Sequence, residues 1–174
     1  MNYGEIKKND IANGEGVRTS LFVSGCRHHC KNCFNQSTWD FSFGELFTEK
    51  TVEDILFSCE PDWVNGLSLL GGEPFEPENQ KVLLPFLIMF KERFPNKDIW
   101  CYSGFTFEEI IGKEKSRAHT DISKEMLGLI DILVDGRFVE EKKDISLVFR
   151  GSSNQRIIDV KKSLKEKEII LYLE

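Results

Sequence analysis

Three of the five cysteines in this chain lie within eight residues of one another. Their spacing, Cys-x3-Cys-x2-Cys, allows three thiols on one loop to wrap three corners of a cubane cluster. An ordinary four-iron cluster takes four protein thiolates, and here no fourth cysteine lies near in the sequence. One iron would stay open to an outside ligand, which a catalyst needs and an electron carrier does not. The pattern predicts a [4Fe–4S] cluster held by Cys26, Cys30 and Cys33.

Two other metal sites are compatible with this loop. One is a zinc site completed by His28 or His29, although zinc sites more often combine two separated Cys-x2-Cys pairs. The other is a four-thiolate cluster that recruits Cys59 or Cys101. We favour the open cluster. Cys59 and Cys101 have apolar neighbours and are expected to be buried core thiols, and the two histidines are expected to be solvent-facing loop residues.

A second candidate feature is the Gly-Gly-Glu-Pro turn at residues 71–74, which follows an apolar stretch. Two glycines after a strand let the backbone approach a ligand with no Cβ in the way. The backbone groups of the turn and the Glu73 carboxylate can then face a cation such as an amino group. Alone, this tetrapeptide more often marks an ordinary strand-to-helix turn. Beside an open cluster, we interpret it as part of a ligand site.

The elements that must position these residues alternate between short apolar strands and segments of helical periodicity. This alternation indicates βαβ units and a parallel sheet, hence an α/β fold. Because the carboxyl ends of parallel strands carry the ligand site in such folds, the cysteine loop and the glycine-containing turns should meet at one rim. We predict strands at Thr19–Ser24, Leu67–Leu70, Asp98–Tyr102, Asp131–Val134 and Leu147–Arg150, and helices at Thr51–Cys59, Glu78–Phe94 and Ser123–Ile130.

Local signals refine this pattern. Thr51 is a plausible N-cap of the first helix, and Thr106 with Glu109 forms a capping-box pair that opens a short helix. Aromatic residues alternate with polar ones at positions 39, 41 and 43. We interpret Trp39, Phe41 and Phe43 as an edge strand packed on the core, the alternative being an exposed patch for a protein partner.

Length and composition exclude several classes of protein. The 174 residues fit one domain but not a complete eight-stranded barrel, which needs about 250 residues. The net charge of −6 argues against a nucleic-acid binder. No apolar run is long enough for a membrane span, and the N-terminus lacks the pattern of a signal peptide. The odd cysteine count does not indicate a disulfide framework, so we expect a cytoplasmic location.

The cysteine motif followed by the Gly-Gly-Glu-Pro turn resembles the radical S-adenosylmethionine (SAM) superfamily. Further stretches resemble its glycyl-radical-enzyme activases, and in particular those that act on anaerobic ribonucleotide reductases. The resemblance runs from about Gly14 to Val160, and we recognise no counterpart for the last dozen residues. Its motifs are Gly14–Gly25, Cys33–Trp39, Val134–Phe138 and Phe149–Arg156.

This resemblance implies a single radical SAM domain over residues 1–174, built as a partial (β/α) barrel of about five to six mainly parallel strands. It implies an oxidoreductase in which SAM binds the open iron and is reductively cleaved. The product radical would form a glycyl radical on the large subunit of an anaerobic ribonucleotide reductase. A low-potential donor such as flavodoxin or ferredoxin would supply the electron. The alternatives are the activase of another glycyl radical enzyme, a radical SAM enzyme with a small-molecule substrate, and a non-catalytic iron–sulfur or zinc module.

The resemblance also implies residues that contact SAM. Phe34 would pack near the adenine, and the turn at residues 71–73 would receive the methionine amino group. Strand-end residues could reach the ribose or the carboxylate, their alternatives being turn chemistry and a surface ion pair. Residues 150–156 have two interpretations, a contact to the carboxylate or the partner, and a plain surface loop. The full expected set is Asn32, Cys33, Phe34, Gly71, Gly72, Glu73, Ser103, Asp135 and Arg137.

Overall fold

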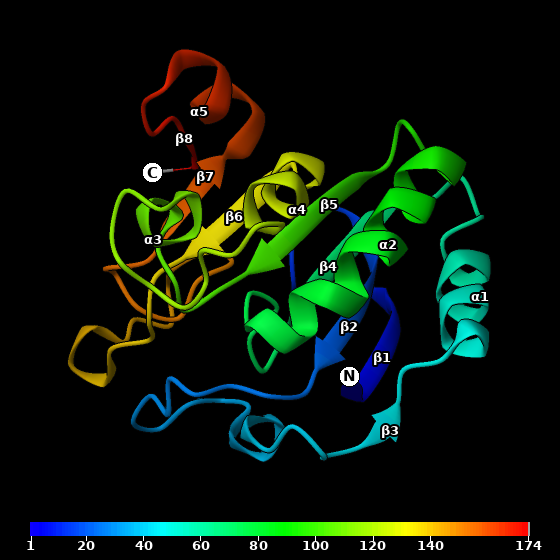
Figure 1. Ribbon diagram of the computed structural model, residues 1–174, viewed down its shortest axis with the longest axis horizontal. Helices are drawn as coiled ribbons and strands as arrows, with labels where there is room; N and C mark the ends of the chain where they lie inside the picture. The colour runs from blue at the N-terminus through cyan, green and yellow to red at the C-terminus, as the bar shows by residue number, and fades with distance from the viewer. Residues whose placement is uncertain (174) are drawn as a thin grey trace.

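The computed structural model describes residues 1–173 and shows one sheet with helices packed against it (Figure 1). The eight strands lie in the order β3-β1-β2-β4-β5-β6-β7-β8. Their bounds are β1 Asn2–Asp10, β2 Val17–Val23, β3 Glu45–Leu46, β4 Val64–Gly71, β5 Asp98–Tyr102, β6 Ile132–Asp135, β7 Arg156–Asp159 and β8 Leu171–Leu173. The helices are α1 Glu49–Ser58, α2 Pro77–Arg93, α3 Phe107–Ile111, α4 Ser123–Leu129 and α5 Val160–Glu166, with short 3-10 turns η1 Gln36–Trp39 and η2 Glu140–Lys142.

The centre of the sheet consists of four parallel strands, β2, β4, β5 and β6. Strands covered on both faces read as near-continuous apolar runs, and all four were predicted from such runs. The observed bounds of β5 are those predicted, and the bounds of the other three strands differ from the predicted ones by one to three residues. The prediction of an α/β fold around a parallel sheet is therefore confirmed.

The flanking strands correct the predicted topology. β1 and β3 on one side, and β7 and β8 on the other, all pair antiparallel. The sheet thus has eight strands of which four are parallel, where five to six mainly parallel strands were expected, and its two edges, β3 and β8, do not join. The flanking strands escaped prediction because β1 is mostly polar and exposed and the last two are short.

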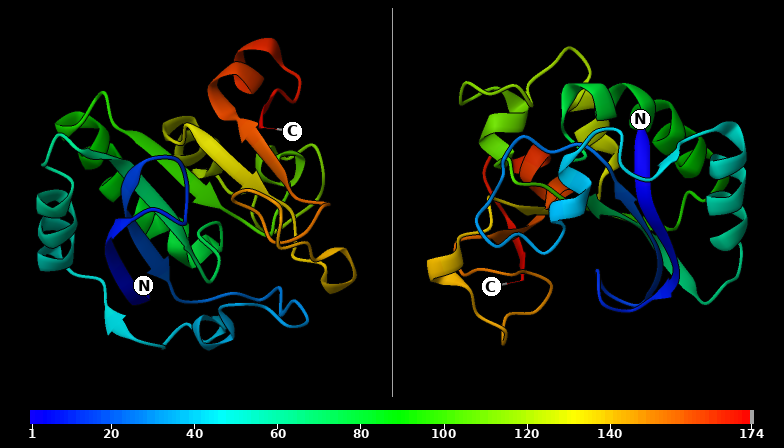
Figure 2. Two further views of the ribbon diagram at one scale, coloured as in Figure 1. Left: turned by 180° about the vertical axis from the view of Figure 1, so that it is seen from behind. Right: turned by 90° about the horizontal axis from the view of Figure 1, so that it is seen from below.

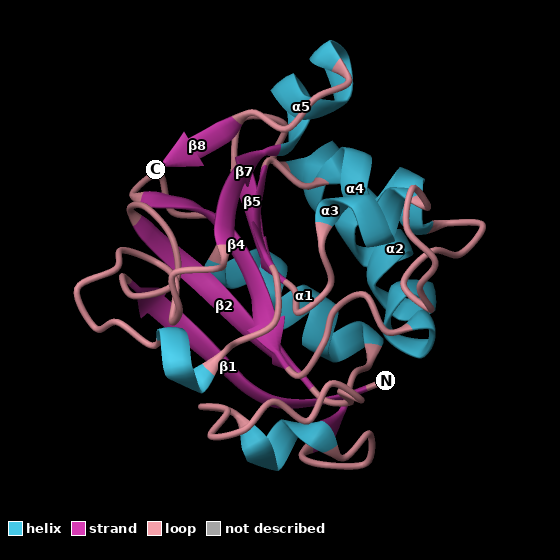
Figure 3. Ribbon diagram, turned by 90° about the vertical axis from the view of Figure 1, so that its left-hand side faces the viewer, coloured by secondary structure: helices cyan, strands magenta, loops and turns pink. Residues whose placement is uncertain are grey.

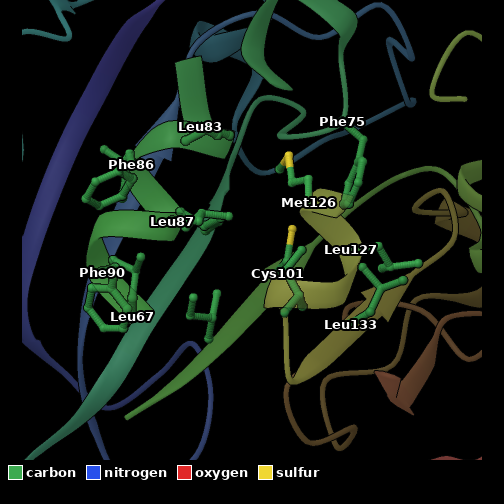
Figure 4. Packing of buried hydrophobic residues seen from close by; sticks show 14 of the residues in the cluster. Leu67, Phe75, Leu83, Phe86, Leu87, Phe90, Cys101, Met126, Leu127 and Leu133 are labelled. Carbon is green, nitrogen blue, oxygen red and sulfur yellow. The ribbon is translucent and has the colours of Figure 1, made fainter. Parts of the chain in front are cut away.

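Helices α1 to α4 cover one face of the sheet (Figure 3). The apolar residues of β2, β4, β5 and β6 that point to this face pack against them in one continuous core. Figure 4 shows its centre, where residues of α2 and α4 meet Leu67, Cys101 and Leu133 from three strands. Cys59 and Cys101 are fully buried here, as predicted. Among residues 1–173, no helix is both long and apolar enough to cross a membrane.

The opposite face carries a smaller apolar cluster of Trp100, Ile132, Val134 and Ile157. Beside it lies the fully buried Arg18, whose guanidinium donates hydrogen bonds to the Ser68 hydroxyl and to backbone carbonyls and forms an ion pair with Asp98. Loops rather than helices cover this face (Figures 2 and 3). It is the face on which the cavity described below lies.

Three local predictions are wrong. Thr48, not Thr51, is the N-cap of α1, and Thr51 is its capping-box partner. Residues 147–150 do not form a strand, because Phe149 has a φ of 55°, which belongs to the left-handed region and not to a strand. Trp39 ends the short turn η1, and Phe41 and Phe43 follow it in a loop, so the edge strand is instead β3. The capping box of Thr106 and Glu109 is confirmed.

Candidate active site at the carboxyl ends of the parallel strands

A cavity of about 580 Å³ opens where the four parallel strands end. Its walls come from the cysteine loop, the turn after β4, the ends of β5 and β6, and the segment that precedes β7. In Figures 1 and 2 the cysteine loop (light blue) and this last segment (orange) lie along the same side of the sheet. The expectation that the loop and turns meet at one rim is thus confirmed. Of the predicted residues, the cavity is lined by Cys26, Cys30, Cys33, Phe34, Gly71, Gly72, Glu73 and Ser103.

Backbone hydrogen bonds anchor the start of the cysteine loop and form a turn between its second and third cysteines. The amide of Cys26 donates to the carbonyl of Trp39 at 3.0 Å, and the amide of Cys33 donates to the carbonyl of Cys30 at 3.1 Å. All three thiols are free. Burial and the charges of Glu73 and Glu76 raise the pKa of Cys26 to about 12, and burial also raises the pKa of Cys30. A metal binds the thiolate form of cysteine, so any metal that these thiols held would have to displace their protons.

The zinc alternative can be compared with the placement of the possible ligands. Within residues 1–173, no three side chains of histidine, cysteine, aspartate or glutamate are grouped so as to hold one metal ion. A tetrahedral zinc site with Zn–S bonds of about 2.3 Å would need such a group. His29 is exposed and stacks on Trp39 at 4.5 Å between ring centroids.

His28 corrects the expectation that both histidines face solvent. Only 3% of its side chain is exposed, and its ring lies 4.3 Å from that of Phe105. Its Nε2 lies 3.0 Å from Oε2 of Glu73, and its Nδ1 accepts a hydrogen bond of 3.1 Å from Nε of Arg137. Both ring nitrogens are therefore occupied by protein partners, which leaves neither available as a metal ligand.

The Glu73 carboxylate is fully buried and receives hydrogen bonds from several segments. The amide of Phe75 and the hydroxyl of Ser103 donate to Oε1 at 2.9 and 2.8 Å. The amide of Gly104 donates to Oε2 at 2.7 Å, and His28 contacts the same oxygen. A carboxylate with this many donors is saturated. Glu73 therefore joins the turn after β4, the end of β5 and the cysteine loop.

The two glycines before Glu73 allow this turn to lie against the cysteine loop. Gly71 has a φ of 101°, a conformation that favours glycine. A Cβ on Gly72 would lie 2.7 Å from the carbonyl oxygen of Gly25, at the start of the cysteine loop. The amide of Glu73 donates to that same carbonyl at 2.9 Å. No residue with a side chain could replace Gly72 without displacing the backbone of the loop.

A second buried carboxylate, Glu76, holds the outer side of the loop. The amide and guanidinium of Arg27 donate to it, as does the guanidinium of Arg117. Burial opposes ionisation, but these hydrogen bonds keep the pKa of Glu76 below its usual range. The residue next to Cys26 is thus tied to the N-terminal end of α2 and to the segment before α4.

Three of the predicted cofactor residues do not line the cavity. Asn32 is exposed in the loop, with a φ of 55°. Asp135 is buried and accepts hydrogen bonds from the amide of Phe107 and the guanidinium of Arg156, so its carboxylate caps α3. Arg137 reaches the cavity wall only through His28. These placements put all three beside the cavity, and none of them in its wall.

The residues present fit an iron–sulfur cluster with a small organic ligand. The cavity is within the range of roughly 300–1,000 Å³ that holds such ligands. Three soft sulfur ligands lie on one wall. The hydroxyl of Tyr102, the indole Nε1 of Trp39 and Nε of Arg150 are buried at the cavity and have no hydrogen-bond partner among the described residues. Buried polar atoms without partners are uncommon, and a polar ligand would supply them.

Comparison with known proteins assigns the family. Residues 12–158 match the family described as "4Fe-4S single cluster domain". The chain is 42% identical over 159 residues to the anaerobic ribonucleoside-triphosphate reductase-activating protein of Haemophilus influenzae, covering 90% of this chain and 97% of the relative. The chain belongs to this family of activating proteins. The corresponding protein of Pasteurella multocida is 43% identical with 90% and 96% coverage, and that of Escherichia coli is 38% identical with 89% and 96% coverage.

In this member of the activating-protein family, sequence reasoning missed much of the cavity wall. His28 was assigned to solvent, and Phe22, Tyr102 and Phe149 were not singled out although all line the cavity. Phe22 and Tyr102 share one signal that could have found them, because each lies near the carboxyl end of a correctly predicted parallel strand, on the face away from the helices. Phe149 carried no such signal, since its position depends on a loop conformation.

Proposed function

We propose that this chain is a radical SAM enzyme that activates an anaerobic ribonucleotide reductase by forming a glycyl radical on it. One observation carries the proposal. Three free thiols and a Gly-Gly-Glu turn share one cavity at the carboxyl ends of parallel strands, in a chain about 40% identical to reductase-activating proteins. We also infer that the open sheet is a partial barrel of the radical SAM type, and that residues 1–174 form a single domain.

In this proposal Cys26, Cys30 and Cys33 hold a [4Fe–4S] cluster, whose fourth iron is left for SAM. The bound pair supplies reductive cleavage of SAM, which yields a radical able to remove a hydrogen atom from a glycine of the reductase. The protein supplies the thiolates, a wall that excludes water, and the placement of SAM. A flavodoxin or ferredoxin is the electron donor that we propose, and a reducing cytoplasm suits the free thiols.

We propose that the turn at residues 71–73 binds the amino group of the methionine part of SAM. Its glycines expose backbone to the cavity, while Glu73 is occupied in holding the surrounding segments together. Phe34 lines the cavity but is 70% exposed, with its ring 5.4 Å from that of Phe138. This position at the mouth suits stacking against an adenine. Ser103, through its hydrogen bond to Glu73, positions the same turn.

Direct contacts of SAM with Asn32, Asp135 and Arg137 stay predictions. For Asp135, the hydrogen bonds to Phe107 and Arg156 favour an indirect role, in which the carboxylate fixes the end of β6. For Arg137, the hydrogen bond to His28 favours an indirect role as well. Arg150, which lines the cavity, is the better candidate for a carboxylate of the ligand, because its buried Nε has no hydrogen-bond partner among residues 1–173 and its Nη1 donates to the backbone carbonyl of Gln155.

The test is anaerobic loading with iron and sulfide, followed by dithionite reduction and measurement of 5′-deoxyadenosine formed from SAM. We expect about four irons per chain in the wild type, and loss of both iron binding and cleavage when any one of the three loop cysteines is changed to Ala. Addition of the reductase should then give the electron paramagnetic resonance (EPR) doublet of a glycyl radical. SAM cleavage without that doublet would point to another glycyl radical enzyme. A protein that binds zinc and cleaves nothing would refute the proposal.

A further inference from the structure

His28 stands apart from the other side chains of the cysteine loop. Arg27, His29, Lys31 and Asn32 are exposed, whereas the His28 ring is buried against Phe105 and lines the cavity. A polar ring buried in this way requires partners for both of its nitrogens. Glu73 and Arg137 provide them.

The two hydrogen bonds fix which ring nitrogen carries the proton. Nε of Arg137 can only donate, so Nδ1 of His28 must accept. The hydrogen therefore sits on Nε2, which donates to Oε2 of Glu73. The imidazole is held as one neutral tautomer between a guanidinium and a carboxylate, and its orientation in the cavity is set from both sides.

The carboxylate does not need His28 to be satisfied. Glu73 already accepts from the amides of Phe75 and Gly104 and from the hydroxyl of Ser103, all of which belong to its own turn or to the end of β5. His28 is the one side chain from the cysteine loop that reaches this carboxylate among the described residues. The hydrogen bond from His28, which lies between Cys26 and Cys30, therefore links the cysteine loop to the Gly-Gly-Glu turn.

We infer that His28 is a positioning residue that holds the cysteine loop in register with the turn at residues 71–73. This inference rests on the proposed function, in which the loop carries the cluster and the turn carries the SAM amino group. One SAM molecule must contact the cluster and the turn at the same time. Without the link, the thiols still bind iron, but the open iron and the turn are no longer held at the separation that one SAM molecule spans.

Two variants of His28 test its hydrogen bonds to Glu73 and to Arg137 separately. In His28→Gln the side-chain amide reaches about as far as Nε2, so the donor to Glu73 is kept and the acceptor for Arg137 is lost. In His28→Asn the amide reaches only as far as Nδ1, so the donor to Glu73 is lost. His29→Asn is the matched control, because His29 is exposed and Asn tolerates its φ of 51°.

The experiment measures three quantities on the reconstituted, full-length variants under anaerobic conditions. These are the iron content per chain, the dissociation constant for SAM, and the change that SAM causes in the EPR spectrum of the reduced cluster. We expect all variants to hold as much iron as the wild type. His28→Asn should bind SAM about tenfold more weakly, the effect of losing one hydrogen bond to a buried charge, and show a diminished spectral change. His28→Gln and His29→Asn should resemble the wild type.

Two results would overturn this inference. If His28→Asn binds SAM with wild-type affinity and an unchanged spectral response, the link positions nothing. If both His28 variants lose iron, the histidine is needed for the loop to fold, which is a structural role. The proposed function fails separately, and the inference with it, if the wild type itself holds iron but neither binds nor cleaves SAM.

Discussion

Replacing Asp10 by Asn should destabilise the fold and disturb the floor of the cavity. Asp10 ends β1, is 1% exposed, and accepts hydrogen bonds from the Ser20 hydroxyl, the Asn13 amide and the backbone amide of Ala12. Lys7 adds an ion pair at 3.2 Å. In Asp10→Asn, one of the two accepting oxygens becomes an NH₂ group that faces donors. Ala12 and Asn13 line the cavity, so the loop that carries them loses its anchor.

The size of the expected destabilisation follows from the pKa of Asp10. Burial opposes ionisation, but the hydrogen bonds from Ser20, Asn13 and Ala12 lower the pKa to about 2. The unfolded chain has a value of about 3.9, so the difference is about 2 pKa units, or roughly 2.5 kcal/mol at neutral pH. For a chain of this length each kcal/mol shifts Tm by about 2–4 °C. We therefore expect Asp10→Asn to lower Tm by about 5–10 °C.

The sign of the pH dependence follows from the lowered pKa. The ionised group stabilises the folded state at pH values above the unfolded pKa, and this stabilisation is lost as the pH falls toward the folded pKa. The difference between wild type and Asp10→Asn should therefore be largest at pH 7 and shrink between about pH 5 and pH 2. Thermal unfolding followed by circular dichroism across that range measures it. Asp62→Asn is the control that should change little, because the Asp62 carboxylate is exposed and makes no hydrogen bond or ion pair with the other described residues. A difference that is below about 0.5 kcal/mol at pH 7, or the same at pH 7 and pH 3, would refute the reasoning.

The remaining predictions concern the buried thiols and the mouth of the cavity. Cys59→Ala and Cys101→Ala should each keep full iron content and SAM cleavage while losing about 1–2 kcal/mol of stability, because each leaves a small void in the core; iron loss in a folded variant would mean that the wrong thiols were chosen. Ile145 is 95% exposed and lines the cavity, and we expect the reductase to approach there. Ile145→Asp should leave SAM cleavage without the reductase unchanged but lower the yield of glycyl radical. Trp63→Asp, at a residue that is 67% exposed and lies at the opposite ends of the parallel strands, should lower neither. Equal effects of these two substitutions would show that the mouth does not contact the partner.

The parts of the fold that could be predicted are those with strong local signals. The four parallel strands are apolar because both of their faces are covered, and α2 and α4 follow the helical period, so their types and approximate bounds were predictable. β1 carries only a few apolar residues in nine, because most of it is exposed. Its pairing with β2 depends on tertiary contacts that no short window of sequence contains.

In the candidate site, too, local sequence signals were predictable and tertiary contacts were not. The common location of the cysteines and the glycines was predictable, because both follow parallel strands whose carboxyl ends meet at one rim. His28 was not, because two adjacent histidines in a loop look alike in sequence. What distinguishes them is the buried carboxylate of Glu73, 45 positions further along the chain, which only the folded structure brings to Nε2 of His28. Likewise, the hydrogen bonds that bury the Asp135 carboxylate could not be predicted, because its partner Arg156 comes from the next strand.

The open sheet has a consequence for solubility. A closed barrel has no edge strands, but this sheet ends in β3 and β8, and an exposed edge can pair with a strand of another molecule. Both edges are short, with two residues in β3 and three in β8. A run of charged residues, Lys165 to Glu168, comes just before β8. β3 pairs with only two residues of β1, and the rest of the β1 edge carries Lys7 and Lys8 and an irregular register, features that discourage pairing with a foreign strand. The sheet can therefore stay open without inviting edge-to-edge aggregation.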